Sequence, residues 1–78
     1  MSEEICSSIQ QAVSAAIEDS TVSVEGGGGH YRIDVLSKAF EGKNRVQKQR
    51  MVLSAIAHLM KGDGAPVHAV DAIVTRTE

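Results

Sequence analysis

Residues 21–35 read TVSVEGGGGHYRIDV, and this stretch decides how the chain folds. Polar and apolar residues alternate over 21–25 and again over 30–35, which is typical of half-buried β-strands. Residues 26–29 are four glycines, and because glycine loses the most conformational freedom on folding, this run favours a flexible loop over a strand or helix. We therefore predict an antiparallel hairpin with a long glycine loop, in which one face carries Tyr31, Ile33 and Val35.

Apolar residues at helical spacing occur on both sides of this hairpin. Ser2 followed by Glu3 and Glu4 is typical of a helix start, because carboxylates are stabilised near the positive end of the helix dipole. A second helix is predicted over about 45–60, and Lys61-Gly62 supplies its stop. The predicted apolar stripes are Ile5, Ile9, Val13, Ala16 and Ile17 in the first helix, and Val52, Leu53, Ile56, Leu59 and Met60 in the second.

Two further segments complete the predicted core and sheet. Residues 37–44 are predicted to form a polar turn whose Phe40 side chain is buried in the core. Residues 67–75 are predicted to form the last strand. Because strand–helix–strand connections are nearly always right-handed, we expect this strand to pair in parallel with 30–35. The result is one α+β domain over residues 1–78, with a three-stranded mixed sheet and both helices packed on one face. In the last strand, one face is expected to carry Val70, Ala72 and Val74, and the other Ala69, Asp71 and Ile73.

Length and composition limit what the domain can be. The chain has 78 residues and a hydrophobic fraction of 42%, which is enough for one core. The single cysteine, Cys6, excludes an internal disulfide and is predicted to pack at the edge of the first apolar stripe. No apolar run approaches the roughly 20 residues of a membrane helix, and the start Met-Ser-Glu-Glu is acidic where a signal peptide is basic. We therefore expect a cytoplasmic protein with no membrane partner.

Charge is distributed unevenly along the chain, although the net charge is only −2. Residues 1–25 contain five acids and no Lys or Arg, whereas residues 38–50 contain five bases and one acid, Glu41. One interpretation is a solvated helix face, and the other is a docking patch for an acidic partner or a phosphate backbone. The bases are Lys38, Lys43, Arg45, Lys48 and Arg50.

The sequence does not predict an enzyme. No Ser or Cys is accompanied by a base and an orienting group, and no His-rich metal motif occurs. The glycines at 26–29 are not predicted to form a phosphate-binding loop. Such a loop is followed by the first turn of a helix, whereas these glycines are followed by a predicted strand. His58, at the edge of the second apolar stripe, is interpreted as a surface or boundary residue.

The other two histidines, His30 and His68, each open a predicted strand. If these strands are parallel neighbours, both imidazoles lie near one edge of the sheet. Imidazole nitrogen is a good ligand for zinc or for iron in a cluster, but two ligands do not complete a site, so another chain would have to supply the rest. Hydrogen-bonded structural histidines are the alternative interpretation.

Four segments of this sequence occur together in one known family. They are GHYRI at 29–33, SKAFEG at 37–42, RVQKQRMV at 45–52 and VHAV at 67–70. In this order and spacing they resemble the BolA family, in particular its YrbA/IbaG-like branch, over residues 28–77. The resemblance implies the order helix-strand-strand-helix-helix-strand, αββααβ, a class II KH-like fold that agrees with the elements predicted above.

The resemblance also implies a function. Family members bind monothiol glutaredoxins and share a [2Fe-2S] cluster with them, so it implies an adaptor in iron–sulfur trafficking or in iron or stress sensing. The glutaredoxin supplies its active-site cysteine and a glutathione thiol, and the BolA-like chain supplies the histidine of the Val-His-Ala motif, His68. Several relatives carry a loop cysteine where this chain has Gly27, so the second ligand role passes to His30, the only ligand-capable residue close by. The alternatives without a loop ligand are a more labile shared cluster, or glutaredoxin binding through His68 alone. No cofactor is expected in the isolated chain, which should be a monomer or a weak dimer.

Some family members also bind DNA, which makes a KH-like transcriptional regulator the alternative function. The residues to test are the bases Lys43, Arg45, Lys48 and Arg50. Nucleic-acid-binding KH domains carry a Gly-x-x-Gly clamp, whereas residues 42–45 read GKNR and have an arginine in the last place. The slightly acidic net charge also argues against this alternative, because nucleic-acid-binding domains tend to be basic.

Overall fold

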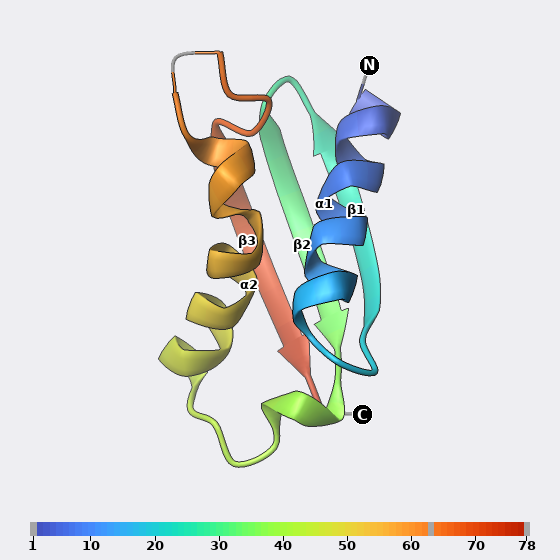
Figure 1. Cartoon of the computed structure of the whole chain (residues 1–78), viewed down its shortest axis with the longest axis vertical. Helices are drawn as coiled ribbons and strands as arrows, with labels where there is room; N and C mark the ends of the chain where they lie inside the picture. The colour runs from blue at the N-terminus through green and yellow to red at the C-terminus, as the bar shows by residue number, and fades with distance from the viewer. Residues whose placement is uncertain (1, 63, 78) are drawn as a thin grey trace.

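The computed structural model describes residues 2–62 and 64–77 (Figure 1). It confirms the predicted α+β architecture, a three-stranded mixed sheet with both long helices on one face. The second helical segment of the αββααβ order is a single 3-10 turn, η1. In chain order the elements are α1 (Ser2–Ala16), β1 (Thr21–Gly27), β2 (His30–Leu36), η1 (Lys38–Phe40), α2 (Arg45–Met60) and β3 (Ala69–Arg76).

The sheet has the strand order β1-β2-β3, so the hairpin strand β2 is central. β1 pairs with β2 antiparallel and β3 pairs with β2 in parallel, as predicted. In Figure 1, α1 crosses in front of β1 and β2, and α2 lies in front of β3. The turn between β1 and β2 and the segment that enters β3 therefore lie at the same end of the molecule, the upper end in Figure 1. No helix in the described part of the chain is long and apolar enough to cross a membrane.

The hairpin turn is tighter than predicted. Gly26 and Gly27 belong to β1 and pair with Tyr31 and His30, so the expectation of a four-glycine flexible loop was wrong. Only Gly28 and Gly29 form the turn, with φ angles of 63° and 86°. A two-residue turn with positive φ at both positions matches the twist of an antiparallel hairpin, and glycine adopts this conformation without steric cost.

A β-bulge in β3 changes which of its residues face the core. Tyr31 pairs with Val70 but Arg32 pairs with Ala72, so Asp71 is an extra residue without a partner in β2. Paired residues in a sheet point to the same face, and Ile73 is therefore placed beside the buried Ile33. The prediction that Val70, Ala72 and Val74 share one face was wrong, because the bulge shifts the alternation by one residue and turns a larger side chain than Ala72 toward the core.

Most of the predicted core is confirmed. Phe40 is fully buried, and Val52 and Ile56 anchor α2. Ala16 and Leu53 are exposed, so their assignment to the apolar stripes was wrong. Leu53 lies about 100° around the helix from Val52, outside the narrow stripe that faces the sheet, and the smaller Ala55 packs against the core instead. The buried apolar residues of the hydrophobic cluster are Ile9, Val13, Ile17, Val22, Tyr31, Ile33, Val35, Phe40, Val52, Ile56 and Val67.

The bounds of α2 agree with the predicted helix. Its start is fixed by a capping box, in which the Gln47 N–H donates to Asn44 Oδ1 at 2.9 Å and the Asn44 N–H donates to Gln47 Oε1 at 3.0 Å. The helix ends at Met60, before Lys61 and Gly62, whose φ is 87°. These local signals place the basic first turns of α2 at the end of the molecule away from the hairpin turn.

Candidate functional site

The structure brings His30 and His68 to the same end of the sheet, as their places in the sequence predicted. His30 begins β2 and pairs in register with Ala69, the first residue of β3. The carbonyl oxygen of Gly29 accepts hydrogen bonds from the backbone N–H groups of both His68 and Ala69, each at 2.9 Å. The hairpin turn is thus joined directly to the start of β3, and both histidine side chains are exposed there.

The imidazole of His68 rests against the backbone of Gly29. A Cβ atom added at Gly29 would overlap His68 Cδ2, so no other residue fits there without moving the ring. Neither ring nitrogen of His68 is hydrogen-bonded to any residue that the structure describes. The ring is therefore held from one side by the glycine and accessible from the other.

His30 has a partner that the sequence did not reveal. Its Nδ1 lies 3.2 Å from Asp71 Oδ1, and the two side chains are 60% and 63% exposed. Because an ionised carboxylate can only accept, a hydrogen bond between these two groups requires the proton on Nδ1 of His30. Asp71 was expected on a strand face with Ala69 and Ile73, and only the bulge in β3, which the sequence pattern does not signal, places it beside His30.

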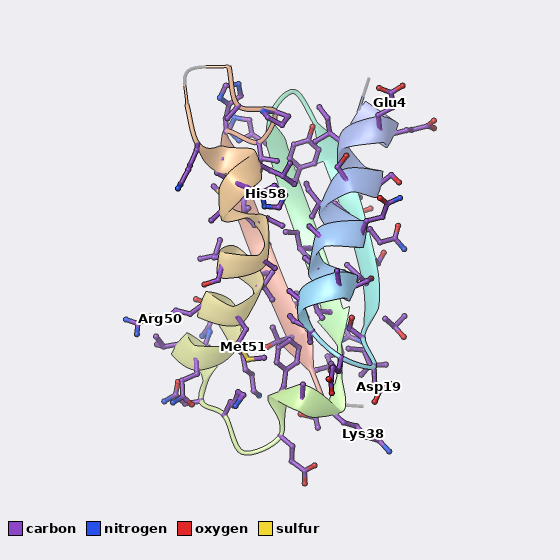
Figure 2. The ribbon with its side chains drawn as sticks, viewed as in Figure 1. Glu4, Asp19, Lys38, Arg50, Met51 and His58 are labelled. Carbon is purple, nitrogen blue, oxygen red and sulfur yellow. The ribbon has the colours of Figure 1, made fainter. Side chains whose placement is uncertain are left out.

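The two histidines do not form a complete metal site. Within the described residues no group of three or more His, Cys, Asp or Glu side chains could hold a metal ion. Cys6 packs partly buried against the core from α1, as predicted, and His58 is exposed on α2 (Figure 2). What this end of the sheet offers is a pair of imidazoles to which another molecule would add ligands.

The structure places two of the four predicted DNA-binding residues in one groove. Arg45 and Lys48 line a groove between α2 and β3, together with Gln49. Arg50 lies at the cleft between α1 and α2, beside Ala16 and Met51, and its side chain extends outward in Figure 2. Lys43 is exposed in the turn before α2. The helix separates these groups because Arg50 is about 140° around the axis from Arg45.

The fold defines the class of protein: a small α+β domain with one face of a three-stranded mixed sheet covered by helices. The sequence model of the family described as BolA-like protein matches residues 5–78 of this chain. The chain belongs to the BolA-like family, which is not generally enzymatic. The comparisons do not test its assignment to the YrbA/IbaG-like branch, which stays a prediction.

Solved structures of BolA homologues are similar over most of the chain. A BolA protein homologue from Coxiella burnetii is 30% identical, with a TM-score of 0.71, over 88% of this chain and 86% of that one. BolA1 from Mus musculus is 29% identical, with a TM-score of 0.67, over 92% of this chain and 63% of that one. BolA1 from Arabidopsis thaliana, 23% identical over 91% of this chain and 88% of that one, shares the fold with a TM-score of 0.75. Comparison with curated protein sequences gives no match.

Proposed function

We propose that this chain is a cytoplasmic adaptor that binds a monothiol glutaredoxin and shares a [2Fe-2S] cluster with it, in iron–sulfur trafficking or in iron or stress sensing. The cluster is its cargo, and His68 is its principal ligand. The observation that carries the proposal is the exposed imidazole of His68, packed against Gly29 and free of hydrogen bonds to the described residues. A ligand to a shared metal centre must be both held in place and reachable by the partner, and this ring meets both conditions.

The register of the hairpin supports His30 as the second ligand. Gly27, which stands where several relatives have a loop cysteine, pairs directly with His30 across β1 and β2. Residues paired across antiparallel strands point to the same face with their Cβ atoms about 5 Å apart. A ligand at position 27 and a ligand at position 30 would therefore serve the same small region, so His30 can take the place of the cysteine.

The chemistry of the ligand set also supports sharing with a thiol-bearing partner. A [2Fe-2S] cluster needs four ligands, and two imidazoles on one iron with two thiolates on the other is a known arrangement. His68 and His30 supply two nitrogens, and the cysteine of a glutaredoxin together with glutathione would supply two sulfurs. With this division, one copy of either protein supplies only part of the four-ligand set.

The test is to mix the chain with a monothiol glutaredoxin, iron, sulfide and glutathione and to record the visible absorption and circular dichroism spectra. The wild-type mixture is expected to differ from the glutaredoxin homodimer, and His68→Ala is expected to abolish this difference. His58→Ala is the matched control, because it removes an exposed imidazole from α2, outside the proposed site. A His68→Ala mixture with the wild-type spectrum would refute the ligand role.

One observation favours a second candidate function, a KH-like DNA-binding regulator. The groove between α2 and β3 carries Arg45, Lys48 and Gln49 along the edge strand of the sheet. Long cationic side chains beside an extended groove are suited to a phosphate backbone. Lys43 and Arg50 are not among the residues that line this groove, so it contains two of the four predicted bases.

A further inference from the structure

If His30 binds the shared cluster, as proposed above, its ring must present a nitrogen lone pair to iron. A neutral imidazole carries its proton on either Nδ1 or Nε2, and free histidine in water favours Nε2. A ring in that form can offer only Nδ1, which lies close to the backbone and is the more hindered of the two nitrogens. A group that holds the proton on Nδ1 would instead leave Nε2, at the outer end of the ring, as the ligand atom.

Asp71 is placed to do this. Its Oδ1 lies 3.2 Å from His30 Nδ1, although the two residues are 41 positions apart in the chain. The extra residue in β3 is Asp71 itself, since Val70 pairs with Tyr31 and Ala72 with Arg32. Bulges next to functional sites commonly re-aim one side chain, and a bulge in a parallel pair of strands is rare.

Building on the proposed function, we propose that Asp71 is a positioning residue that holds His30 in the Nδ1-protonated form, so that Nε2 binds the iron of the shared cluster. Carboxylates that accept the second N–H of a metal-bound histidine fix the orientation of the ring and raise its basicity. His68 has no such partner among the described residues and is held by Gly29 instead. The two ligands are thus oriented by different means, one by a hydrogen bond and one by packing.

A role in stabilising the fold does not account for this contact. Both side chains are more than half exposed, and exposed ion pairs contribute little to stability because water screens them. Replacing Asp71 should therefore leave the domain folded, which makes its effect on His30 measurable in the intact chain.

The first measurement is the tautomer of His30 in the isolated protein, from the 15N chemical shifts of its ring. Asp71→Ala is expected to move the proton from Nδ1 to Nε2, and Asp71→Asn should allow the same shift because its amide N–H can donate to Nδ1. Asp71→Glu keeps an acceptor-only carboxylate and should preserve the wild-type form. Glu25→Ala is the control, since it removes an exposed carboxylate from β1 of the same sheet and should change nothing at His30. An unchanged His30 tautomer in Asp71→Ala would overturn the proposal.

The second measurement is the lifetime of the mixed cluster with glutaredoxin under a chelator. We expect Asp71→Ala to shorten it about 10-fold, with Asp71→Glu, which keeps the carboxylate, close to the wild type. A wild-type lifetime in Asp71→Ala would overturn the role of Asp71 while leaving cluster sharing intact. If the wild-type chain forms no mixed cluster, both the proposed function and the role of Asp71 fail. The wild-type sample therefore distinguishes a failure of cluster sharing from a failure of the Asp71 role alone.

Discussion

Gly29 does two things at once in this structure. It supplies the second positive φ of the hairpin turn, and its missing side chain makes room for the imidazole of His68. Its neighbour Gly28 also has a positive φ, but a Cβ added there would meet no atom within 4 Å. Both glycines therefore adopt a positive φ, but only Gly29 leaves room for His68. Comparing substitutions at the two positions separates the effect on the turn from the effect on the His68 ring.

At this scale we predict that Gly28→Ala and Gly29→Ala both lower the free energy of unfolding by about 1–2 kcal/mol, the cost of a left-handed conformation for an L-residue. Only Gly29→Ala should also shift the ring resonances of His68 and weaken the mixed cluster, because its methyl group displaces the ring. Urea unfolding and two-dimensional NMR of the histidine rings measure the two effects. Equal His68 resonances in both variants would show that Gly29 does not position the ring.

At the scale of elements, α2 and β3 together determine the groove that carries Arg45 and Lys48. The capping box at Asn44 and Gln47 fixes where α2 begins and therefore which of its residues face β3. Arg50 belongs to the same helix and has the same charge, but it is not among the residues that line this groove, and its side chain extends outward from the helix (Figure 2). Membership of one helix does not make these three bases one binding surface.

The different positions of Arg45 and Lys48 on one side and Arg50 on the other provide a test of the DNA-binding alternative. If a DNA backbone occupies the groove, Arg45→Ala and Lys48→Ala should each weaken binding and reduce the slope of log K against log salt by about 0.9. Arg50→Ala should leave the slope unchanged, and fluorescence anisotropy with duplex DNA at several salt concentrations measures all three. Equal effects of the three substitutions would indicate diffuse electrostatic attraction, and no binding at low salt would exclude the alternative.

At the scale of the whole molecule, stability depends on very few large side chains. The chain has one Phe, one Tyr and no Trp, and Phe40 is fully buried although it comes from the connection between β2 and α2. Ser37 holds that connection in place, because its hydroxyl accepts from the Ala39 N–H at 3.0 Å and donates to the Glu18 carbonyl at 2.7 Å. The connection thus closes the core at the end away from the histidines.

We predict that Phe40→Ala costs about 3–5 kcal/mol, the usual loss for a buried phenyl ring. A domain of this size has about 4–12 kcal/mol in total, so this variant should be largely unfolded or melt far below the wild type. Phe40→Leu, which preserves most of the volume, should retain the fold. Thermal unfolding followed by circular dichroism distinguishes these outcomes, and a Phe40→Ala variant with the wild-type melting temperature would contradict the burial seen here.

The sequence by itself determined the elements and their order. The bounds of α2 and the two hairpin strands follow from residue spacing, capping residues and glycines, which act over a few neighbours in the chain. The parallel pairing of the last strand follows from the order of the elements, because strand–helix–strand connections are nearly always right-handed. The motifs around His30 and His68 pointed to the BolA-like family because they are short and contiguous.

Only the tertiary structure decided the register between β2 and β3. That register produces the bulge of β3 at Asp71, which places a carboxylate beside His30, and it seats His68 against Gly29. These contacts join residues about 40 positions apart, and they depend on which alignment of the strands buries Ile73 and Val70 against the helices. Local pattern carries no information about that choice, because it is made by packing across the whole core.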